Sequence, residues 1–400
     1  MPVWHDSTRS WVNDGRLVLL GVTQEQHADR CRLFARWQEF EFPILHDPIN
    51  VLQSEAVPIL TAIDEHGIVR DLQPRLETFE AEFLDRSFPA EHTNAEVASA
   101  QPPDLDTLRN LARSNPTADA WRSLGDALAL WGGIGRIDEA IEAYEHALAL
   151  RPDDADSRFR LGVCHRMRFE SPHRLPGDFQ AAVDAWGQAL NQEPNQYIWR
   201  RRIEQYGPRL AKPYPFYDWV DEATEALAAR GEPQVPLAVM PTGAEIAQPS
   251  RDFEVFDAVE QSPDPQGRIN RDRQGLIEAE VAVVPAKVRP GATARVHVTF
   301  LPNAIRKAHW NNESTPLRLW IEPPEGWRVS GKLLTAPQGD EAETNEIRRL
   351  DFEVEVPSSA TGPTRIPAFA LYNVCEDLGG VCLFLRQDLV IEVDVIQEAP

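Results

Sequence analysis

Cys375 and Cys382 are the residues of this chain whose type and spacing best suit chemistry. Six residues separate them, and Gly379 and Gly380 lie within that interval. Glycines at the tip of a hairpin let the chain turn back sharply, so the two sulfurs could come within bonding range. The pair is then an exchangeable disulfide, a structural disulfide or two free thiols. The only chemistry that these residues support is attack by a thiolate through a mixed disulfide.

Other chemistries find little support in the sequence. The ten histidines are scattered, and no Cys/His cluster has the spacing of a zinc site. No Gly-rich phosphate loop, serine elbow or two-histidine helix is present. Cys31 and Cys164 fall on predicted helices, where we interpret them as buried small residues. We expect no cofactor and no metal, and a hydrolase is a poor third choice because no nucleophile–base pair stands out.

Short strands must position the cysteine pair. From about Gly275 onward, apolar residues alternate with polar ones, and Pro, Gly and Asn turns separate the segments. The predicted strands are residues 277–284, 294–300, 317–321, 327–330, 350–356, 364–372 and 381–395. Strands of this length and spacing predict an antiparallel β-sandwich over residues 270–400, with a barrel of similar strand count as the alternative.

The segment TRIPAFALYNVCEDLGGVCLFLRQDLVIEV, with HWNNESTPLRLWIEPPEGW before it, resembles the immunoglobulin-like N-terminal domain of transmembrane thiol-disulfide reductants. In that family a Tyr-x-x-Cys strand pairs with a second cysteine six residues on. Here Tyr372 precedes Cys375, Cys382 comes seven residues later, and the family's aromatic-proline run after it is missing. The resemblance implies that Cys375 and Cys382 are the catalytic pair and exchange electrons with a thioredoxin-like partner.

Two helical hairpins with a shared pattern precede the strands. Over residues 121–152 small or apolar residues recur three and four apart, Gly125 marks a close helix approach, and Pro152 ends the second helix. A weaker copy covers residues 161–194. The pattern resembles the tetratricopeptide repeat, with longer loops in both copies; two unrelated hairpins are the alternative. We expect a helical repeat domain over residues 104–230 that binds a protein or peptide client.

Flanking helices are predicted to complete this repeat domain, because a repeat hairpin cannot bury its apolar stripe alone. They cover residues 104–114, 197–206 and 216–230. The last two carry several aromatic residues, which either shield the end of the stack or line a peptide groove.

The N-terminal residues predict a small α/β sheet. Strands are expected over residues 17–22, 42–45, 57–63 and 68–72, and helices over residues 24–37, capped by Thr23, and 75–83. The phrases GVTQEQ, FPILHD and AVPILTAIDEHGIVR resemble the second half of the thioredoxin-like fold of redoxins and thiol-disulfide oxidoreductases, over residues 1–87. The resemblance implies that Val57 and Pro58 form the cis-proline loop, which contacts the backbone of the substrate.

The family's Cys-x-x-Cys motif is missing from this segment. It normally opens a helix, and this sequence begins Met1-Pro2-Val3-Trp4 as though already inside that helix. We expect that a late start codon has removed the central strand and both cysteines, with a redox-inactive remnant as the alternative. As written, the segment has no thiolate with which to attack a disulfide there.

Composition restricts the partners and the compartment. The net charge of −23 argues against nucleic acid or anionic membranes as partners. No apolar run approaches ~18 residues, so we expect no membrane span. The first residues lack the features of a signal peptide, which predicts the cytoplasm for the chain as written and the periplasm if the true N-terminus lies upstream. Residues 88–103 and 231–269 are interpreted as linkers.

These observations predict a protein associated with thiol-disulfide redox chemistry. Its repeats would hold a client, the Cys375 and Cys382 pair would exchange disulfides, and its thioredoxin-like domain is catalytically incomplete as given. The chain would be an oxidoreductase in full only if its N-terminus is truncated. The alternative is a non-enzymatic scaffold whose modules assemble protein partners. Replacing both cysteines by serine separates the two hypotheses.

Overall fold

The structure is a computed structural model that describes residues 2–89, 101–210, 217–246, 252–255, 261–377 and 380–396. The chain forms two compact units. Unit 1 comprises Met1–His173, Gln188–Arg202 and Phe216–Pro241. Unit 2 comprises Arg174–Gly187, Ile203–Pro215 and Thr242–Pro400. The domain boundaries predicted from the sequence stay predictions.

The N-terminal part of unit 1 holds short strands and helices. Its elements are α1 (Pro2–Asn13), β1 (Gly21–Thr23), α2 (Ala28–Trp37), β2 (Ile44–His46), β3 (Thr61–Ile63), β4 (Val69–Leu72) and a π-helical turn (Glu80–Leu84). β1 pairs with β2 in parallel, and β3 pairs with β4 around a turn in which Asp64 accepts hydrogen bonds from the N–H groups of His66 and Ile68. In the described residues these are two separate two-stranded sheets, which differs from the single sheet expected.

Three boundaries in this part differ from the prediction. The strand expected over residues 17–22 begins only at Gly21, and Val18 before it is 79% exposed. Thr23 ends β1 opposite His46 and does not cap α2, so the helix begins at Ala28. The helix expected over residues 75–83 is reduced to the π-helical turn.

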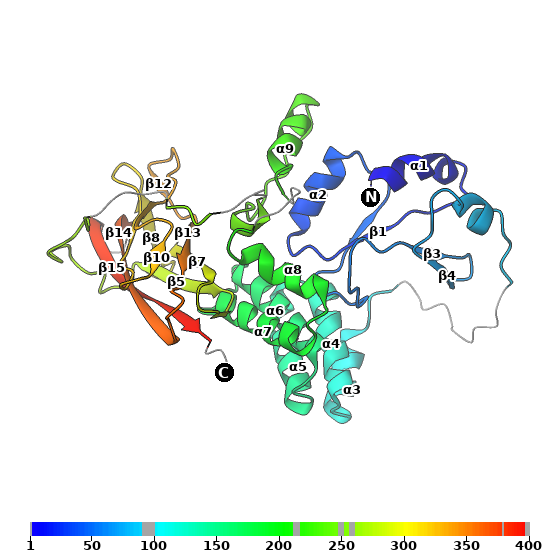
Figure 1. Cartoon of the computed structure of the whole chain (residues 1–400), viewed down its shortest axis with the longest axis horizontal. Helices are drawn as coiled ribbons and strands as arrows, with labels where there is room; N and C mark the ends of the chain where they lie inside the picture. Colours follow the sequence, from blue (N-terminus) through cyan, green and yellow to red (C-terminus); the bar gives the residue numbers. More distant parts are fainter. Residues whose placement is uncertain are drawn as a thin grey trace. The chain divides into compact units, whose positions relative to one another are not determined.

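The middle of unit 1 is a series of helices in which neighbours along the chain pack on each other (Figure 1). They are α3 (Leu105–Ser114), α4 (Ala118–Trp131), α5 (Ile137–Leu150) and α6 (Ala155–Phe169), with a 3-10 turn (Ile134–Arg136) before α5. Thr117 and Asp154 cap α4 and α6 by accepting hydrogen bonds from backbone N–H groups. A Cβ atom at Gly125 would lie 2.8 Å from Cε1 of Tyr144, which confirms the close helix approach predicted there.

Three further helices follow: α7 (Asp178–Gln192), α8 (Tyr197–Tyr206) and α9 (Val220–Ala229). The predicted aromatic shielding is present in α8, where Trp199 stacks on Phe159 of α6 with ring centroids 5.1 Å apart. Helix α9 differs from its predicted role as a cap of the repeats. Its buried Val220, Ala223 and Leu227 cluster with Leu33 of α2, so its apolar face packs against α2. Tyr214 and Phe216, which the sequence also suggested for shielding, lie outside the described residues.

Unit 2 contains two β-sheets. One has the strand order β10-β13-β7-β5, and the other has the order β11-β9-β14-β15-β6, with β8 pairing to β14 and β12 to β8. The strands are β5 (Ile277–Val284), β6 (Lys287–Val288), β7 (Thr293–Pro302), β8 (Ala308–Asn311), β9 (Arg318–Ile321), β10 (Arg328–Val329), β11 (Leu333–Thr335), β12 (Glu343–Thr344), β13 (Arg348–Glu355), β14 (Gly362–Glu376) and β15 (Val381–Val395).

One hydrophobic core joins the two sheets. Phe300 and Phe352 from the first sheet and Trp310, Tyr372 and Ile391 from the second belong to the same buried cluster. Two separate sheets around a shared core are a sandwich, so the alternative of a closed barrel is wrong. Each predicted strand is present, and the predicted bounds of β5 and β15 agree with the structure. Strands β6, β8, β11 and β12 were not predicted.

Candidate functional site

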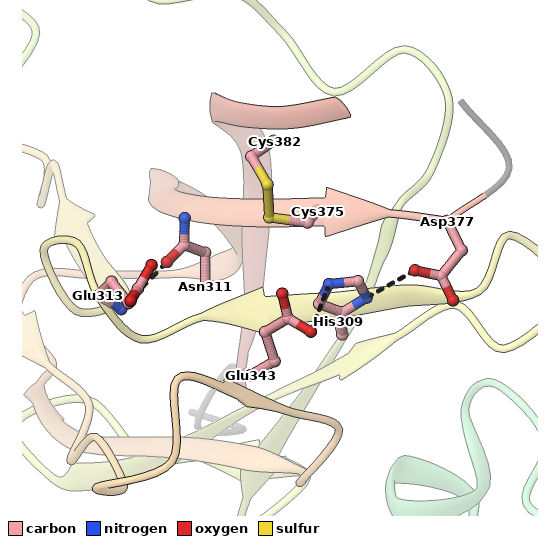
Figure 2. The surroundings of a disulfide bond; sticks show 7 residues. All are labelled: His309, Asn311, Glu313, Glu343, Cys375, Asp377 and Cys382. Carbon is pink, nitrogen blue, oxygen red and sulfur yellow. Dashed lines mark hydrogen bonds and ion pairs between the residues drawn. A yellow bond between two sulfur atoms is a disulfide. The ribbon is translucent and has the colours of Figure 1, made fainter. Parts of the chain in front are cut away.

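The long hairpin of β14 and β15 positions the two cysteines (Figure 1). Cys375 and Cys382 are direct partners in its antiparallel ladder, with Cα atoms 3.9 Å apart, and a disulfide joins them (Figure 2). The pair is therefore not two free thiols in this structure. Gly379, expected at the hairpin tip, lies outside the described residues, and Gly380 has a left-handed φ of 62°.

The two cysteines differ in their exposure to solvent. Cys375 is only 5% exposed, because β14 lies between β8 and β15 at this position. Cys382 is exposed on β15. An incoming thiolate must approach along the axis of the disulfide bond and needs one accessible sulfur. Of the two residues, Cys382 is the one that solvent reaches more easily.

His309 of β8 is the residue opposite Cys375 on the other side of β14. Directly paired residues of adjacent strands point to the same face of a sheet, so His309, Cys375 and Cys382 form one row. The imidazole lies between two carboxylates, with Nε2 3.5 Å from Oε2 of Glu343 and Nδ1 3.8 Å from Oδ1 of Asp377 (Figure 2). Its side chain is 14% exposed.

The opposite face of the same strands anchors the hairpin. Tyr372, which the sequence singled out before Cys375, is fully buried and donates a hydrogen bond from its hydroxyl to Oδ2 of Asp272 at 2.9 Å. Trp310, next to His309, is buried in the core and donates from Nε1 to the carbonyl of Glu346. Burial raises the pKa of Tyr372, so this side chain is a neutral hydrogen-bond donor with a structural role.

Val57 and Pro58, the other predicted site residues, belong to unit 1, whereas the cysteine pair belongs to unit 2. The peptide bond between them is cis, as predicted. Both residues are exposed in the segment before β3, and Val57 is 53% exposed. They are accessible to a partner, and their role as a backbone contact stays a prediction.

A small cavity in unit 1 contains the free thiol of Cys31. Its volume is about 160 Å³, and its lining residues are Thr23, Glu25, Arg30, Cys31, Phe34, Ile44, Tyr217 and Trp219. The thiol donates a hydrogen bond to Oγ1 of Thr23 at 3.4 Å. Burial raises the pKa of Cys31 to about 11, so the thiol stays protonated at neutral pH and is a weak nucleophile. Cys164 is fully buried in α6, and burial raises its pKa as well.

No cluster of three or more His, Cys, Asp or Glu side chains within the described residues could hold a metal ion. In the same part of the chain, no helix is both long and apolar enough to cross a membrane.

The site and its surroundings define a protein with a helical repeat region and a two-sheet unit that carries a disulfide. A family model described as a TPR repeat matches residues 134–166, which span α5 and most of α6. This match confirms a tetratricopeptide repeat in this part of the chain, although it spans the second helix of the first predicted copy (residues 121–152) and the first helix of the second copy (residues 161–194). A TPR repeat supports a role in binding other proteins.

Similar solved structures were also found. One is titled "AvmM Catalyzes Macrocyclization in Alchivemycin A Biosynthesis"; it is 14% identical, with a TM-score of 0.22, over 33% of this chain and 97% of that chain. Another is Spo0M, a sporulation control protein from Bacillus subtilis, at 11% identity and a TM-score of 0.17, over 31% of this chain and 51% of that chain. A third is BslA, a bacterial hydrophobin, at 10% identity and a TM-score of 0.17, over 31% of this chain and 97% of that chain. TM-scores this low support no inference about function.

Proposed function

We propose that this protein exchanges disulfides with a client at Cys375 and Cys382. The observation that carries the proposal is the asymmetry of the pair, in which Cys382 is exposed and Cys375 is buried beside His309. A disulfide that served only stability would gain nothing from an exposed cysteine, because exposed disulfides are the more readily reduced ones.

The reaction begins when a client thiolate attacks Sγ of Cys382. A bond forms between the client sulfur and Sγ of Cys382, and the bond between Cys382 and Cys375 breaks. Cys375 leaves as a thiolate and takes a proton from His309, which the solvent restores. A second thiolate of the client then attacks the client sulfur that is bound to Cys382. The client disulfide forms, the bond to Sγ of Cys382 breaks, and Cys382 leaves as a thiolate. The client dithiol is oxidised to a disulfide, and the cysteine pair receives the two electrons.

The helical repeats supply the binding of the client in this proposal. The TPR match over residues 134–166 supports it, since stacked repeats present an extended surface to other proteins. The resemblance of residues 1–87 to a thioredoxin-like domain adds a second contact, in which Val57 and Pro58 orient the backbone of a bound chain. A thioredoxin-like protein is the redox partner that the resemblance of the C-terminal unit implies.

The second candidate function is a non-enzymatic scaffold, and the TPR match favours it equally well. In that case the disulfide only closes the hairpin of β14 and β15. The two functions make different predictions for the thiols that remain when one cysteine is replaced.

Two single-cysteine variants provide the test. Cys375→Ser leaves the exposed Cys382 thiol, and Cys382→Ser leaves the buried Cys375 thiol. We expect the first variant to form a mixed disulfide with 5,5′-dithiobis(2-nitrobenzoate) at least about tenfold faster than the second, because thiol reactivity requires access. Comparable slow rates, together with retention of the wild-type disulfide in excess dithiothreitol under native conditions, would favour the scaffold.

A further inference from the structure

Strand β15 has an open edge where it carries Cys382. Its pairing with β6 covers only Asp394 and Val395, and Arg386 makes the nearest backbone hydrogen bonds on that edge. Within the part of the chain that the structure describes, no backbone group pairs with β15 from this side between Val381 and Leu385. An uncovered strand edge is a template for pairing with another chain.

The ladder fixes which groups face this open edge. The N–H of Arg386 donates to the carbonyl of Asn270, and its own carbonyl accepts from the N–H of Asp272. Backbone groups alternate between the two sides of a strand, so Phe384 and Cys382 also direct their N–H and C=O groups outward. The Cα distance of 3.9 Å between Cys375 and Cys382 agrees, because partners without mutual hydrogen bonds lie ~4.5 Å apart and bonded partners ~5.5 Å apart.

We propose that an extended, cysteine-bearing segment of the client binds along this edge as an additional strand. Its backbone would pair with the outward groups of Cys382 and Phe384, as in recognition by strand addition. A client cysteine opposite Cys382 would present its side chain on the same face, at a Cα separation of ~5.5 Å, which allows a disulfide. This inference rests on the proposed function and identifies the kind of partner that the site accepts.

The side chains near this edge indicate which residue types the client segment should carry. Phe384 is 40% exposed on the same face as Cys382, so an apolar client residue opposite Phe384, two positions from the client cysteine, would cover it. Asp377, which follows β14, is 66% exposed. Its carboxylate favours a client segment with Lys or Arg near its cysteine.

Proline substitutions on β15 test the inference without removing the disulfide. Phe384→Pro deletes the outward N–H while leaving the ladder with β14 intact, since edge positions of this kind tolerate proline. Val390→Pro is the matched control, because Val390 has the same outward parity on β15 and is 44% exposed. The probes are dithiothreitol and a short peptide with a central cysteine, alternating valines and terminal lysines. A second peptide replaces the valines by prolines.

We expect Phe384→Pro to slow reduction by the valine peptide about tenfold, the effect of losing one or two net hydrogen bonds, and to leave reduction by dithiothreitol within about twofold. Val390→Pro should change neither rate, and the proline peptide should reduce wild-type protein about tenfold more slowly than the valine peptide. Equal rates for the two peptides on wild-type protein overturn the inference even if the variant fails to fold. If neither dithiothreitol nor peptide reduces the native protein, the proposed function fails, and the inference fails with it.

Discussion

Glu170, at the end of α6, gives the sharpest electrostatic prediction for unit 1. Its Oε2 lies 3.3 Å from Nδ1 of His27, its Oε1 accepts a hydrogen bond from Nε of Arg166 at 2.6 Å, and its side chain is 16% exposed. Burial alone would raise the pKa of this carboxyl. Arg166 and His27 outweigh burial and lower the pKa of Glu170 from 4.5 to about 2.

The lowered pKa of Glu170 determines how stability changes with pH. A carboxyl with a lowered pKa stabilises the fold above its unfolded pKa of 4.5, and the stabilisation is lost as the pH falls through about 2. The shift corresponds to about 3 kcal/mol of unfolding free energy at neutral pH. Glu170→Gln should therefore destabilise unit 1 by about 3 kcal/mol at pH 7 and by progressively less between pH 4.5 and pH 2.

Hydrogen exchange in α6, followed by mass spectrometry between pH 7 and pH 3, measures this difference locally. Glu145→Gln, on an exposed position of α5, is the control and should change the opening free energy of α6 by less than about 0.5 kcal/mol. A difference between wild type and Glu170→Gln that stays constant from pH 7 to pH 3 would refute the assignment of the stabilisation to this carboxylate.

Three further variants test the packing of the repeats and the chemistry of the disulfide. Gly125→Ala should lower the free energy of unfolding of the repeat helices by about 1–3 kcal/mol, because its Cβ would overlap the ring of Tyr144. Gly187→Ala in α7, where a new Cβ meets nothing within 4 Å, is the control and should raise the free energy of unfolding by about 0.5–1 kcal/mol. Equal effects of the two substitutions on thermal unfolding would contradict the close approach of Gly125 to Tyr144. His309→Gln should slow reduction of the disulfide by dithiothreitol about tenfold at unchanged melting temperature, through loss of the proton donor beside Cys375. An unchanged rate would remove His309 from the proposed reaction.

The sequence predicted those elements whose signal is long and regular. β5 and the end of β15 alternate apolar and polar residues, and turn residues precede both strands, so their bounds could be predicted. The helices of the repeat follow from apolar spacing, the small residue at Gly125 and the helix end at Pro152. The close pairing of Cys375 with Cys382 followed from a hairpin of the right length.

The missed elements are short and depend on partners far away in sequence. β8 has only four residues, and it exists because β14 pairs with it over Val374, Cys375 and Glu376. His309 could therefore not be assigned to the site from the sequence. The open edge of β15 likewise depends on which strands pair beside it. At the N-terminus, the apolar run before Gly21 suggested a longer strand, but only three residues find a partner in β2.

The reduction potential of the Cys375 and Cys382 pair tests the central claim most directly. The protein would be equilibrated in glutathione redox buffers, the free thiols alkylated, and the reduced fraction measured by mass spectrometry. An exchangeable pair with an exposed cysteine should have a potential between about −120 and −270 mV, the range of known disulfide-exchange proteins. A potential below about −300 mV, typical of structural disulfides, would contradict the proposal and leave the protein as a binding scaffold.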